Sequence, residues 1–271
     1  MKNILLLIFL FFVNCGEIKL ISYNIRYENP NEKINSWKTR ESYVTSFLSD
    51  ENPDFIGLQE VTYSQQRDLV KSLFNHNYIG VGRDDGLDKG EFSPVFYNKN
   101  RYKVLFQDTF WLSKTPEKVS IGWDASMKRI CTYGLFENLA SKKRIWVFNT
   151  HLDHVGIEAK KKSTDLILKK VNSVNKYQNP LILMGDFNLE DDSHSIKKIQ
   201  SQLTDVLFGI KKSDKNYSTF NDFNTRLNTN KRIDYIFVRN LKPLKSGLVK
   251  LKTSEKNWAS DHHPVFSKLK F

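Results

Sequence analysis

Acidic, amide and histidine side chains recur at the ends of short apolar runs along this sequence. Six such runs carry these residues at one end: Asn24, Glu60, His151 with Asp153, Asp186 with Asn188, Asp234, and Asp261 with His262. An Asp or Asn beside a strand is usually a turn or cap residue, so no single one of them indicates a site. If the six ends meet at one edge of a sheet, they form a carboxylate-rich cavity that also contains imidazole.

Such a cavity suits the hydrolysis of a phosphate ester. Hard oxygen ligands such as Glu60 and Asp261 favour Mg²⁺ or Mn²⁺, and the metal would polarise the phosphoryl oxygen and stabilise the leaving oxygen. A histidine can deprotonate water near neutral pH while a carboxylate orients its ring. Asn side chains can donate hydrogen bonds to the charge that develops on the phosphorus group. The two scattered cysteines, Cys15 and Cys131, exclude a Cys-based zinc site.

The elements that must position these residues are short strands alternating with helices. Length and β-branched or aromatic content predict buried strands at residues 18–23, 54–58, 144–148, 181–184, 233–238 and 264–269. Amphipathic patterns predict helices at residues 37–49, 62–74, 156–175 and 193–203. Thr62-x-x-Gln65 predicts a capping box, and Ser193 predicts an N-cap. Residues 92–136 resemble successive strands and turns. We therefore expect an α+β or layered fold with helices outside sheets, but the pattern does not distinguish one mixed sheet from two packed sheets.

The composition fits one globular domain. The chain has 271 residues, of which 39% are hydrophobic and 27% charged, and no repeat or long linker divides it. Its formal net charge of +12 favours an anionic partner, including nucleic acid. The alternative is that the dispersed lysines form solvated faces of helices. We expect a monomer.

The N-terminus predicts export. Lys2 precedes an apolar run over residues 4–13, which is short for a membrane span but suits a signal peptide. We therefore expect a leader at residues 1–16 and a domain at residues 17–271, with the protein secreted or periplasmic. The stretch around Cys15 weakly resembles a lipobox, which would lipidate Cys15 and tether the protein to a membrane. The alternative is that the apolar run is a buried first strand.

Six stretches of the chain, in order, resemble the endonuclease/exonuclease/phosphatase superfamily, also called deoxyribonuclease I-like. They are residues 22–26 (SYNIR), 56–61 (IGLQEV), 149–154 (NTHLDH), 184–188 (MGDFN), 232–236 (RIDYI) and 260–264 (SDHHP). They span almost the whole chain after the leader. The resemblance implies a four-layer α/β/β/α sandwich of two mixed sheets flanked by helices, with the active site at one edge.

The resemblance also implies roles for individual residues. Glu60 is expected to be the principal metal ligand, with Asn24 and Asp261 close to the metal, which is Mg²⁺ or Mn²⁺. His262 is expected to be the catalytic histidine, paired with Asp234. Asp186 would orient or activate water, Asn188 would bind the phosphate, and His151 would contact it from the opposite side. The number of metals and the division of base duty between His262 and Asp186 stay open.

Several further residues have two interpretations. Arg40 and Arg129 occupy places where similar bacterial members often carry arginine, and a guanidinium suits bidentate phosphate binding, but each could equally form a surface ion pair. Asp153 and His154 could touch a second metal or have structural roles. His263 is expected not to be catalytic, because neighbouring side chains on an extended segment point to opposite faces.

Three functions remain in competition. The preferred hypothesis is a nuclease or phosphodiesterase acting on nucleic acid by attack of water assisted by metal and histidine. The alternative is a phosphatase or phospholipase C-like enzyme acting on phosphoinositides, sphingomyelin or another small phosphate ester. A catalytically silent binding protein is disfavoured because relatives of that kind generally lack the histidine or the metal carboxylate, and this chain keeps both.

Overall fold

The computed structural model describes residues 16–226, 228–253 and 257–271. The predicted leader, apart from Gly16, therefore lies outside the described residues, and so does Cys15. Within the described ranges, no helix combines the length and the apolar character needed to cross a membrane.

Twelve strands form two six-stranded sheets at the centre of the fold. The first sheet contains β1 (Glu17–Asn24), β2 (Phe55–Gln59), β3 (His76–Ile79), β4 (Val95–Asn98), β11 (Lys242–Leu248) and β12 (Val265–Lys270), and the second contains β5 (Tyr102–Trp111), β6 (Ile130–Asn138), β7 (Arg144–His151), β8 (Leu181–Asp186), β9 (Thr204–Asp205) and β10 (Asp234–Arg239). The strand orders are β11-β12-β1-β2-β4-β3 and β5-β6-β7-β8-β10-β9. Both sheets mix parallel and antiparallel pairs, because β1 runs parallel to β2 and β7 runs parallel to β8.

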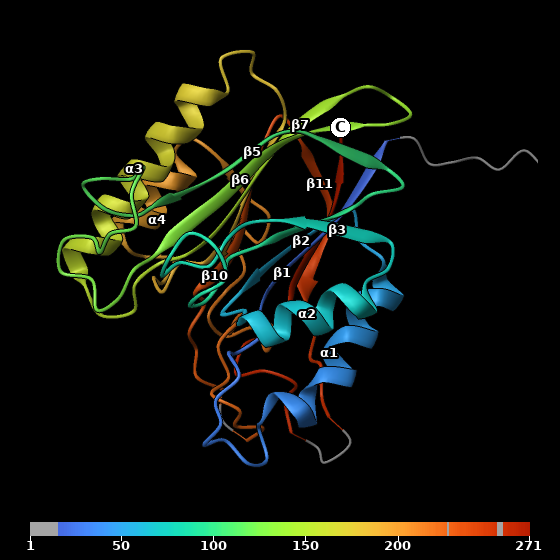
Figure 1. Ribbon diagram of the computed structural model, residues 1–271, viewed down its shortest axis with the longest axis vertical. Helices are drawn as coiled ribbons and strands as arrows, with labels where there is room; N and C mark the ends of the chain where they lie inside the picture. The colour runs from blue at the N-terminus through green and yellow to red at the C-terminus, as the bar shows by residue number, and fades with distance from the viewer. Residues whose placement is uncertain (1–15, 227, 254–256) are drawn as a thin grey trace, which may run out of the picture.

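Helices lie on the two outer faces of the sheets. Figure 1 shows α1 (Trp37–Glu51) and α2 (Tyr63–Ser72) on one side, and α3 (Ile157–Val174) and α4 (His194–Gln200) on the other. Apolar residues of α1 and α2 pack against β1, β2 and β4, while those of α3 and α4 pack against β7, β8 and β10. A third buried cluster joins the inner faces of the two sheets. The structure is thus the predicted four-layer α/β/β/α sandwich.

The strand directions bring the candidate residues to one edge of both sheets. In the second sheet, Asp186 at the end of β8 lies opposite His151 at the end of β7 and Asp234 at the start of β10. In the first sheet, β1 ends at Asn24 beside Gln59, and β12 enters antiparallel to β1 directly after the segment that carries Asp261 and His262. The two sheets therefore present their polar ends to the same region.

A glycine before Asp186 lets β8 reach this edge. Gly185 has φ +149°, and a Cβ there would lie 2.0 Å from the carbonyl oxygen of Thr150 on β7. No side chain fits such an approach, so only glycine allows the paired strands to lie this close immediately before the functional Asp.

The helix signals of the sequence match the observed ends. Thr62 forms the predicted capping box with Gln65, and the Ser193 hydroxyl accepts from the amide of Ile196 at the start of α4. Three strands, β3, β9 and β11, were not predicted. Each is short or polar, and β11 contains Pro243 and Gly247 and lies at a sheet edge, so it lacks the apolar pattern of a buried strand.

Candidate active site

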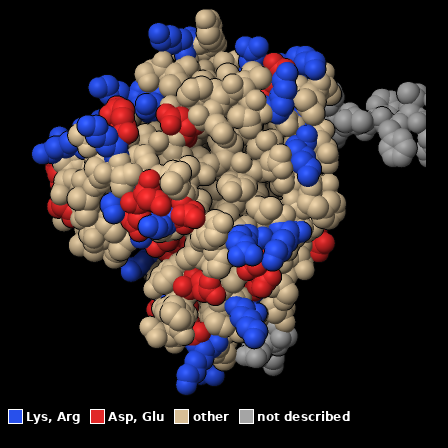
Figure 2. Space-filling model, viewed as in Figure 1, with Lys and Arg blue, Asp and Glu red and all other residues tan. Residues whose placement is uncertain are grey.

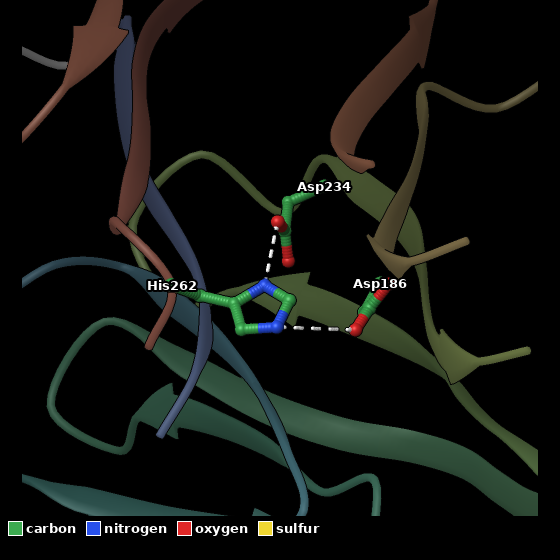
Figure 3. Close-up of side chains that lie close together, drawn as sticks. All are labelled: Asp186, Asp234 and His262. Carbon is green, nitrogen blue, oxygen red and sulfur yellow. Dashed lines mark hydrogen bonds and ion pairs between the residues drawn. The ribbon is translucent and has the colours of Figure 1, made fainter. Parts of the chain in front are cut away.

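His262 and Asp234 form a hydrogen-bonded pair at the edge where the two sheets meet. Nδ1 of His262 lies 2.8 Å from Oδ2 of Asp234, and Nε2 lies 3.8 Å from Oδ2 of Asp186. Figure 3 shows the imidazole between the two carboxylates. Asp234 therefore fixes the ring orientation and leaves Nε2 toward the cavity, which is the arrangement expected of a histidine that handles protons.

The charges of this group are strongly coupled. Burial alone would lower the pKa of His262, but the carboxylates of Asp234 and Asp186 outweigh it and raise that pKa well above its ordinary value. Burial, together with the charge of Asp234, raises the pKa of Asp186 to about 7 even though His262 opposes the shift. At neutral pH His262 therefore carries a proton, while Asp186 is close to its titration point.

His151 and Asn188 lie on the other side of Asp186. Nε2 of His151 is 3.4 Å from Oδ2 of Asp186 and 3.1 Å from Nδ2 of Asn188. The backbone amide of Asn188 donates to Oδ1 of Asp186 at 2.9 Å. Burial, reinforced by the nearby positive charge of Arg129, lowers the pKa of His151 well below its ordinary value, so this imidazole is neutral. His151 and Asn188 thus offer neutral hydrogen-bonding groups beside a carboxylate.

Glu60, Asn24 and Asp261 lie at the end of the cavity formed by the first sheet. Nδ2 of Asn24 donates to Glu60 at 3.1 Å and to Asp186 at 3.0 Å, so this amide bridges the two carboxylates. The pKa of Asp261 is raised to about 6, chiefly by burial and also by the charge of Glu60, although His262 opposes the shift. Buried Asp261 and the partly exposed Glu60 form an oxygen-rich site that a cation would stabilise.

The guanidinium of Arg26 lies between the carboxylates of Glu60 and Asp261. Nη1 of Arg26 lies 3.8 Å from Glu60 and 3.7 Å from Asp261, while its Nη2 donates to Glu32 at 2.7 Å. The backbone amide of Arg26 also donates to Oδ1 of Asn24 at 3.0 Å. Arg26 therefore supplies positive charge at the same position where a divalent cation would be expected.

A second grouping could also hold a metal ion. Within the described residues, Asp186, Asp234 and His262 each place one potential ligand atom within 4.8 Å of the others. In this set Nδ1 of His262 already forms a 2.8 Å contact with Asp234, which suits a hydrogen-bonded acid–base pair. Glu60 and Asp261 offer oxygen donors alone, which is the ligand type that Mg²⁺ and Mn²⁺ prefer.

Most of these groups line one cavity of about 950 Å³, with Asn24 and Asp234 behind its wall. One wall includes Met127 and Arg129, from the segment between β5 and β6, and His154, from the loop after β7. The segment before β10 contributes Phe220, Asp222 and Phe223. The cavity is large enough for a substrate the size of a phosphorylated sugar or a nucleotide.

The model of the Endonuclease/Exonuclease/phosphatase family matches residues 21–262, which is nearly the whole of the described chain. The chain belongs to this family. The predicted resemblance is thereby confirmed, and membership supports a hydrolase that acts on phosphate esters.

Solved structures from the family agree with this assignment. An endonuclease/exonuclease/phosphatase from Bacteroides vulgatus is 35% identical with a TM-score of 0.86, and the match covers 94% of this chain and 99% of that one. A mannosyl-6-phosphatase from Bacteroides thetaiotaomicron is 33% identical with a TM-score of 0.88, covering 94% and 100%. An uncharacterized protein of Acanthamoeba polyphaga mimivirus, L388, is 27% identical over 183 residues, 64% of this chain and 68% of its own.

The two predicted phosphate-binding arginines occupy different places in this family member. Arg129 lines the cavity, and two of its guanidinium nitrogens, Nε and Nη1, have no hydrogen-bond partner among the described residues. Arg40 is 1% exposed and donates to the backbone carbonyls of Ile25, Arg26, Asn35 and Ala259. The structure thus brings Arg129 but not Arg40 to the cavity.

The other uncertain residues have identifiable partners. Asp153 accepts from the backbone amides of Ser126, Val155 and Gly156, which makes it part of a loop scaffold. His154 lines the cavity, where its Nδ1 lies 3.2 Å from Nη2 of Arg129. His263 points away from the cavity and packs edge-on against Trp258.

Six charged residues of the described cavity lining were not predicted, namely Arg26, Glu32, Glu91, Glu190, Asp222 and Lys231. Glu91 lies 4.0 Å from Nδ1 of His151 and forms a bidentate pair with Arg83. Arg26 stands two residues after Asn24 in the SYNIR stretch, which was the available signal for it. Glu91 comes from a loop between β3 and β4 without any strand-end signal.

Proposed function

We propose that this protein is a metal-dependent phosphatase that hydrolyses a small phosphate monoester of a sugar or other polyol. The observation that carries the proposal is the charge of the cavity. Its lining has only three Lys or Arg side chains, Arg26, Arg129 and Lys231, but seven carboxylates: Glu32, Glu60, Glu91, Asp186, Glu190, Asp222 and Asp261. A divalent cation and one phosphate group suit this balance.

A nucleic-acid strand suits it poorly. Proteins that bind such strands neutralise successive phosphates with Lys and Arg, whereas the acids around this cavity would repel the phosphates that flank the scissile one. The net charge of +12 is the observation that favours a nuclease. On the face shown in Figure 2, however, Lys and Arg are interspersed with Asp and Glu and do not form one continuous basic track.

The walls of the cavity favour a polyol as the leaving group. Carboxylates accept hydrogen bonds from hydroxyl groups, and Oε2 of Glu32 is buried without a hydrogen-bond partner among the described residues. The rings of Tyr27, Phe220 and Phe223 supply apolar surface beside these acids. The mannosyl-6-phosphatase relative, 33% identical over almost the full length of both chains, supports the same substrate class.

The residues present fit a divalent cation such as Mg²⁺ or Mn²⁺. Glu60 and Asp261 would hold it, because both are oxygen donors, and the pKa of Asp261 is raised to about 6 by burial and further by the charge of Glu60. When bound, the metal would polarise the phosphoryl oxygen and neutralise part of its charge. Asn24 would keep Glu60 and Asp186 in place through its two hydrogen bonds.

The chain's own residues would divide the chemistry of hydrolysis. Asp186, with a pKa of about 7, would accept a proton from the attacking water. His262 would hold a proton on Nε2 and stabilise the negative charge of the phosphoryl group, while Asp234 keeps Nδ1 occupied. The neutral His151 would donate a hydrogen bond to a phosphate oxygen, and Asn188, whose amide donates to the carbonyl of Leu152 and lies 3.1 Å from Nε2 of His151, would orient that ring. Arg129 would bind the phosphate through Nη1, which has no hydrogen-bond partner among the described residues.

A substrate comparison tests the proposal. The protein would be incubated with Mg²⁺ and with hexose 6-phosphates, bis(p-nitrophenyl) phosphate, phosphoinositide vesicles, plasmid DNA and RNA, each with and without chelator. We expect chelator-sensitive release of inorganic phosphate from the hexose phosphates, with a kcat/KM at least 100-fold above that for any diester. Faster cleavage of DNA or RNA would instead establish the nuclease alternative.

We also propose that the protein is exported, with residues 1–16 as its leader. The support is the sequence alone, namely Lys2 followed by the apolar residues 4–13. The alternative form of this proposal is a lipoprotein leader that ends before Cys15, so that lipidated Cys15 is the mature N-terminus and tethers the protein to a membrane. We also propose that the protein is a monomer.

A further inference from the structure

A second, smaller cavity adjoins the candidate active site. It has a volume of about 220 Å³, and the side chain of Phe220 lines both cavities. The ring of Phe220 also lies edge-on to the ring of His262, with centroids 5.1 Å apart. The small cavity is therefore separated from the catalytic pair by a single aromatic side chain.

The charge of this small cavity is opposite to that of the active site. Its described lining contains three cationic side chains, Lys215, Arg226 and Lys250, and no Asp or Glu. The larger cavity next to it has seven carboxylates. An anion would therefore meet only attraction from the charged side chains of the small cavity.

Buried polar groups form the base of the small cavity. His263 is 6% exposed and Trp258 is 8% exposed, and their rings pack edge to face with centroids 4.6 Å apart. Nδ2 of Asn221 lies 3.5 Å from Nδ1 of His263, which assigns the ring proton to Nε2. His263 and Asn221 both line the cavity and supply polar groups to it.

One of the cations is held in place at the rim. Nζ of Lys250 donates to the backbone carbonyl of Lys215 at 2.9 Å, which joins the segment after β11 to the segment before β10. An ammonium anchored in this way loses less freedom when an anion binds than an unrestrained surface lysine does.

We propose that this small cavity is an anion subsite that binds a phosphate or sulfate group, carried as the second anionic group of a substrate whose scissile phosphate lies in the larger cavity. The inference rests on the proposed phosphatase function and extends it to substrates with two anionic groups. A free inorganic anion offers the same chemistry, so the test has one arm for each source.

The first arm measures binding directly. Sulfate would be titrated calorimetrically into the wild-type protein, into the double variant Arg226→Gln with Lys250→Met, and into Lys252→Met. Lys252 stacks on Trp258 with Nζ 4.9 Å from the ring centroid but does not line the cavity, so it is a matched control for loss of charge. We expect sulfate affinity to fall at least tenfold in the double variant only. Unchanged affinity in the double variant, or an equal loss in the control, would overturn the subsite.

The second arm identifies the source of the anion. KM would be compared for a hexose 6-phosphate and a hexose bisphosphate in the same three proteins. We expect the wild type and the control to show a KM at least tenfold lower for the bisphosphate, and the double variant to lose this difference. Equal KM values with intact sulfate binding would assign the site to free anions. If no monoester is hydrolysed, the proposed function fails, and the sulfate titration still decides the subsite.

Discussion

At the residue scale, Asp234 determines what His262 can do. The carboxylate of Asp234 accepts a hydrogen bond from Nδ1 of His262 at 2.8 Å, and Asp234 is only 1% exposed. The pair therefore behaves as one unit whose titration depends on both members. The same carboxylate contributes to the raised pKa of Asp186, so Asp234 acts on both candidate acid–base groups without facing the substrate itself.

Replacing Asp234 by Asn tests this role through the pH profile. Burial lowers the pKa of His262 and Asp234 raises it, so removing that carboxylate must lower the pKa. If turnover requires protonated His262, activity is lost as pH rises through this pKa. We therefore expect the alkaline limb of kcat to move to lower pH in Asp234→Asn, and kcat to fall roughly 100-fold. The acid limb should move to lower pH as well, because the same carboxylate raises the pKa of Asp186. An alkaline limb that stays in place would contradict the role of protonated His262.

At the element scale, Arg40 joins α1 to both segments that carry the metal-end residues. Its guanidinium donates to the carbonyls of Ile25 and Arg26 after β1, and to Ala259 before β12. The arginine thus positions Asn24 and Asp261 relative to each other through their own backbone segments. This explains how an arginine can be needed for the site without reaching the substrate.

The two arginines should therefore respond differently to substitution. Arg40→Met leaves buried carbonyls without a donor, so we expect a loss of on the order of 3 kcal/mol in the free energy of unfolding. Arg129→Met removes one ion pair, between Nε and Asp153 at 3.5 Å, and no hydrogen bond to a backbone carbonyl, so we expect a smaller loss of stability than for Arg40→Met but a kcat/KM at least tenfold lower. Urea unfolding and steady-state kinetics on both variants check this. An Arg40→Met variant that keeps wild-type stability but loses activity would instead indicate that Arg40 binds the phosphate.

Asp54 shows how element packing perturbs a carboxyl remote from the site. It precedes β2, accepts from the amide of Lys19 on β1 at 2.8 Å, and pairs with Arg101 at 2.7 Å. Burial nevertheless outweighs these contacts and raises its pKa to about 6. Between pH 4 and 6 the folded carboxyl thus holds a proton that the unfolded one has lost, so its contribution to stability decreases as pH rises.

The variant Asp54→Asn should remove that pH dependence. We expect the stability of the wild type relative to the variant to fall by on the order of 3 kcal/mol from pH 4 to pH 7. Denaturant unfolding of both proteins at several pH values measures the difference. A gap that stays constant, or that widens in favour of the wild type as pH rises, would show that the ion pair with Arg101 dominates instead.

The elements also show why much of the fold could be predicted from sequence. Strands such as β2 and β8 are buried along their whole length, so their apolar runs are unambiguous. Edge strand β11 is largely exposed and polar and carries no such signal. Site residues at the ends of buried strands could be predicted from the sequence. Glu91 could not, because it reaches the cavity from a loop. The direction of Arg40 depends on packing between α1 and two distant segments, which local sequence does not encode.

At the scale of the whole molecule, most of the positive charge lies away from the active site. The chain carries a net charge of +12, yet the active-site cavity has an excess of carboxylates. The net charge of the whole chain is therefore a poor guide to the substrate, because only charges within about a Debye length act strongly on a bound phosphate. The excess of carboxylates around the cavity favours a phosphatase over the nuclease that was preferred from the sequence.

The proposed export also belongs to this scale. If residues 1–16 form a leader, expression of the full chain in a bacterial host should place the protein outside the cytoplasm, and its intact mass should correspond to loss of the leader. If Cys15 is the lipidated tether, Cys15→Ser should move the protein from the membrane fraction to the membrane-free fraction. If it is not, the substitution should leave the distribution unchanged. An unprocessed protein in the cytoplasm would contradict the proposal.

His262, held by Asp234, is the group on which the proposed hydrolysis of a small phosphate monoester depends. The most direct measurement is the kcat/KM for phosphate release from a hexose 6-phosphate with Mg²⁺, for the wild type and His262→Ala, with circular dichroism to show that the variant is folded. We predict a fall of roughly 100-fold to 10,000-fold in the variant. A folded His262→Ala protein with wild-type turnover would contradict the account.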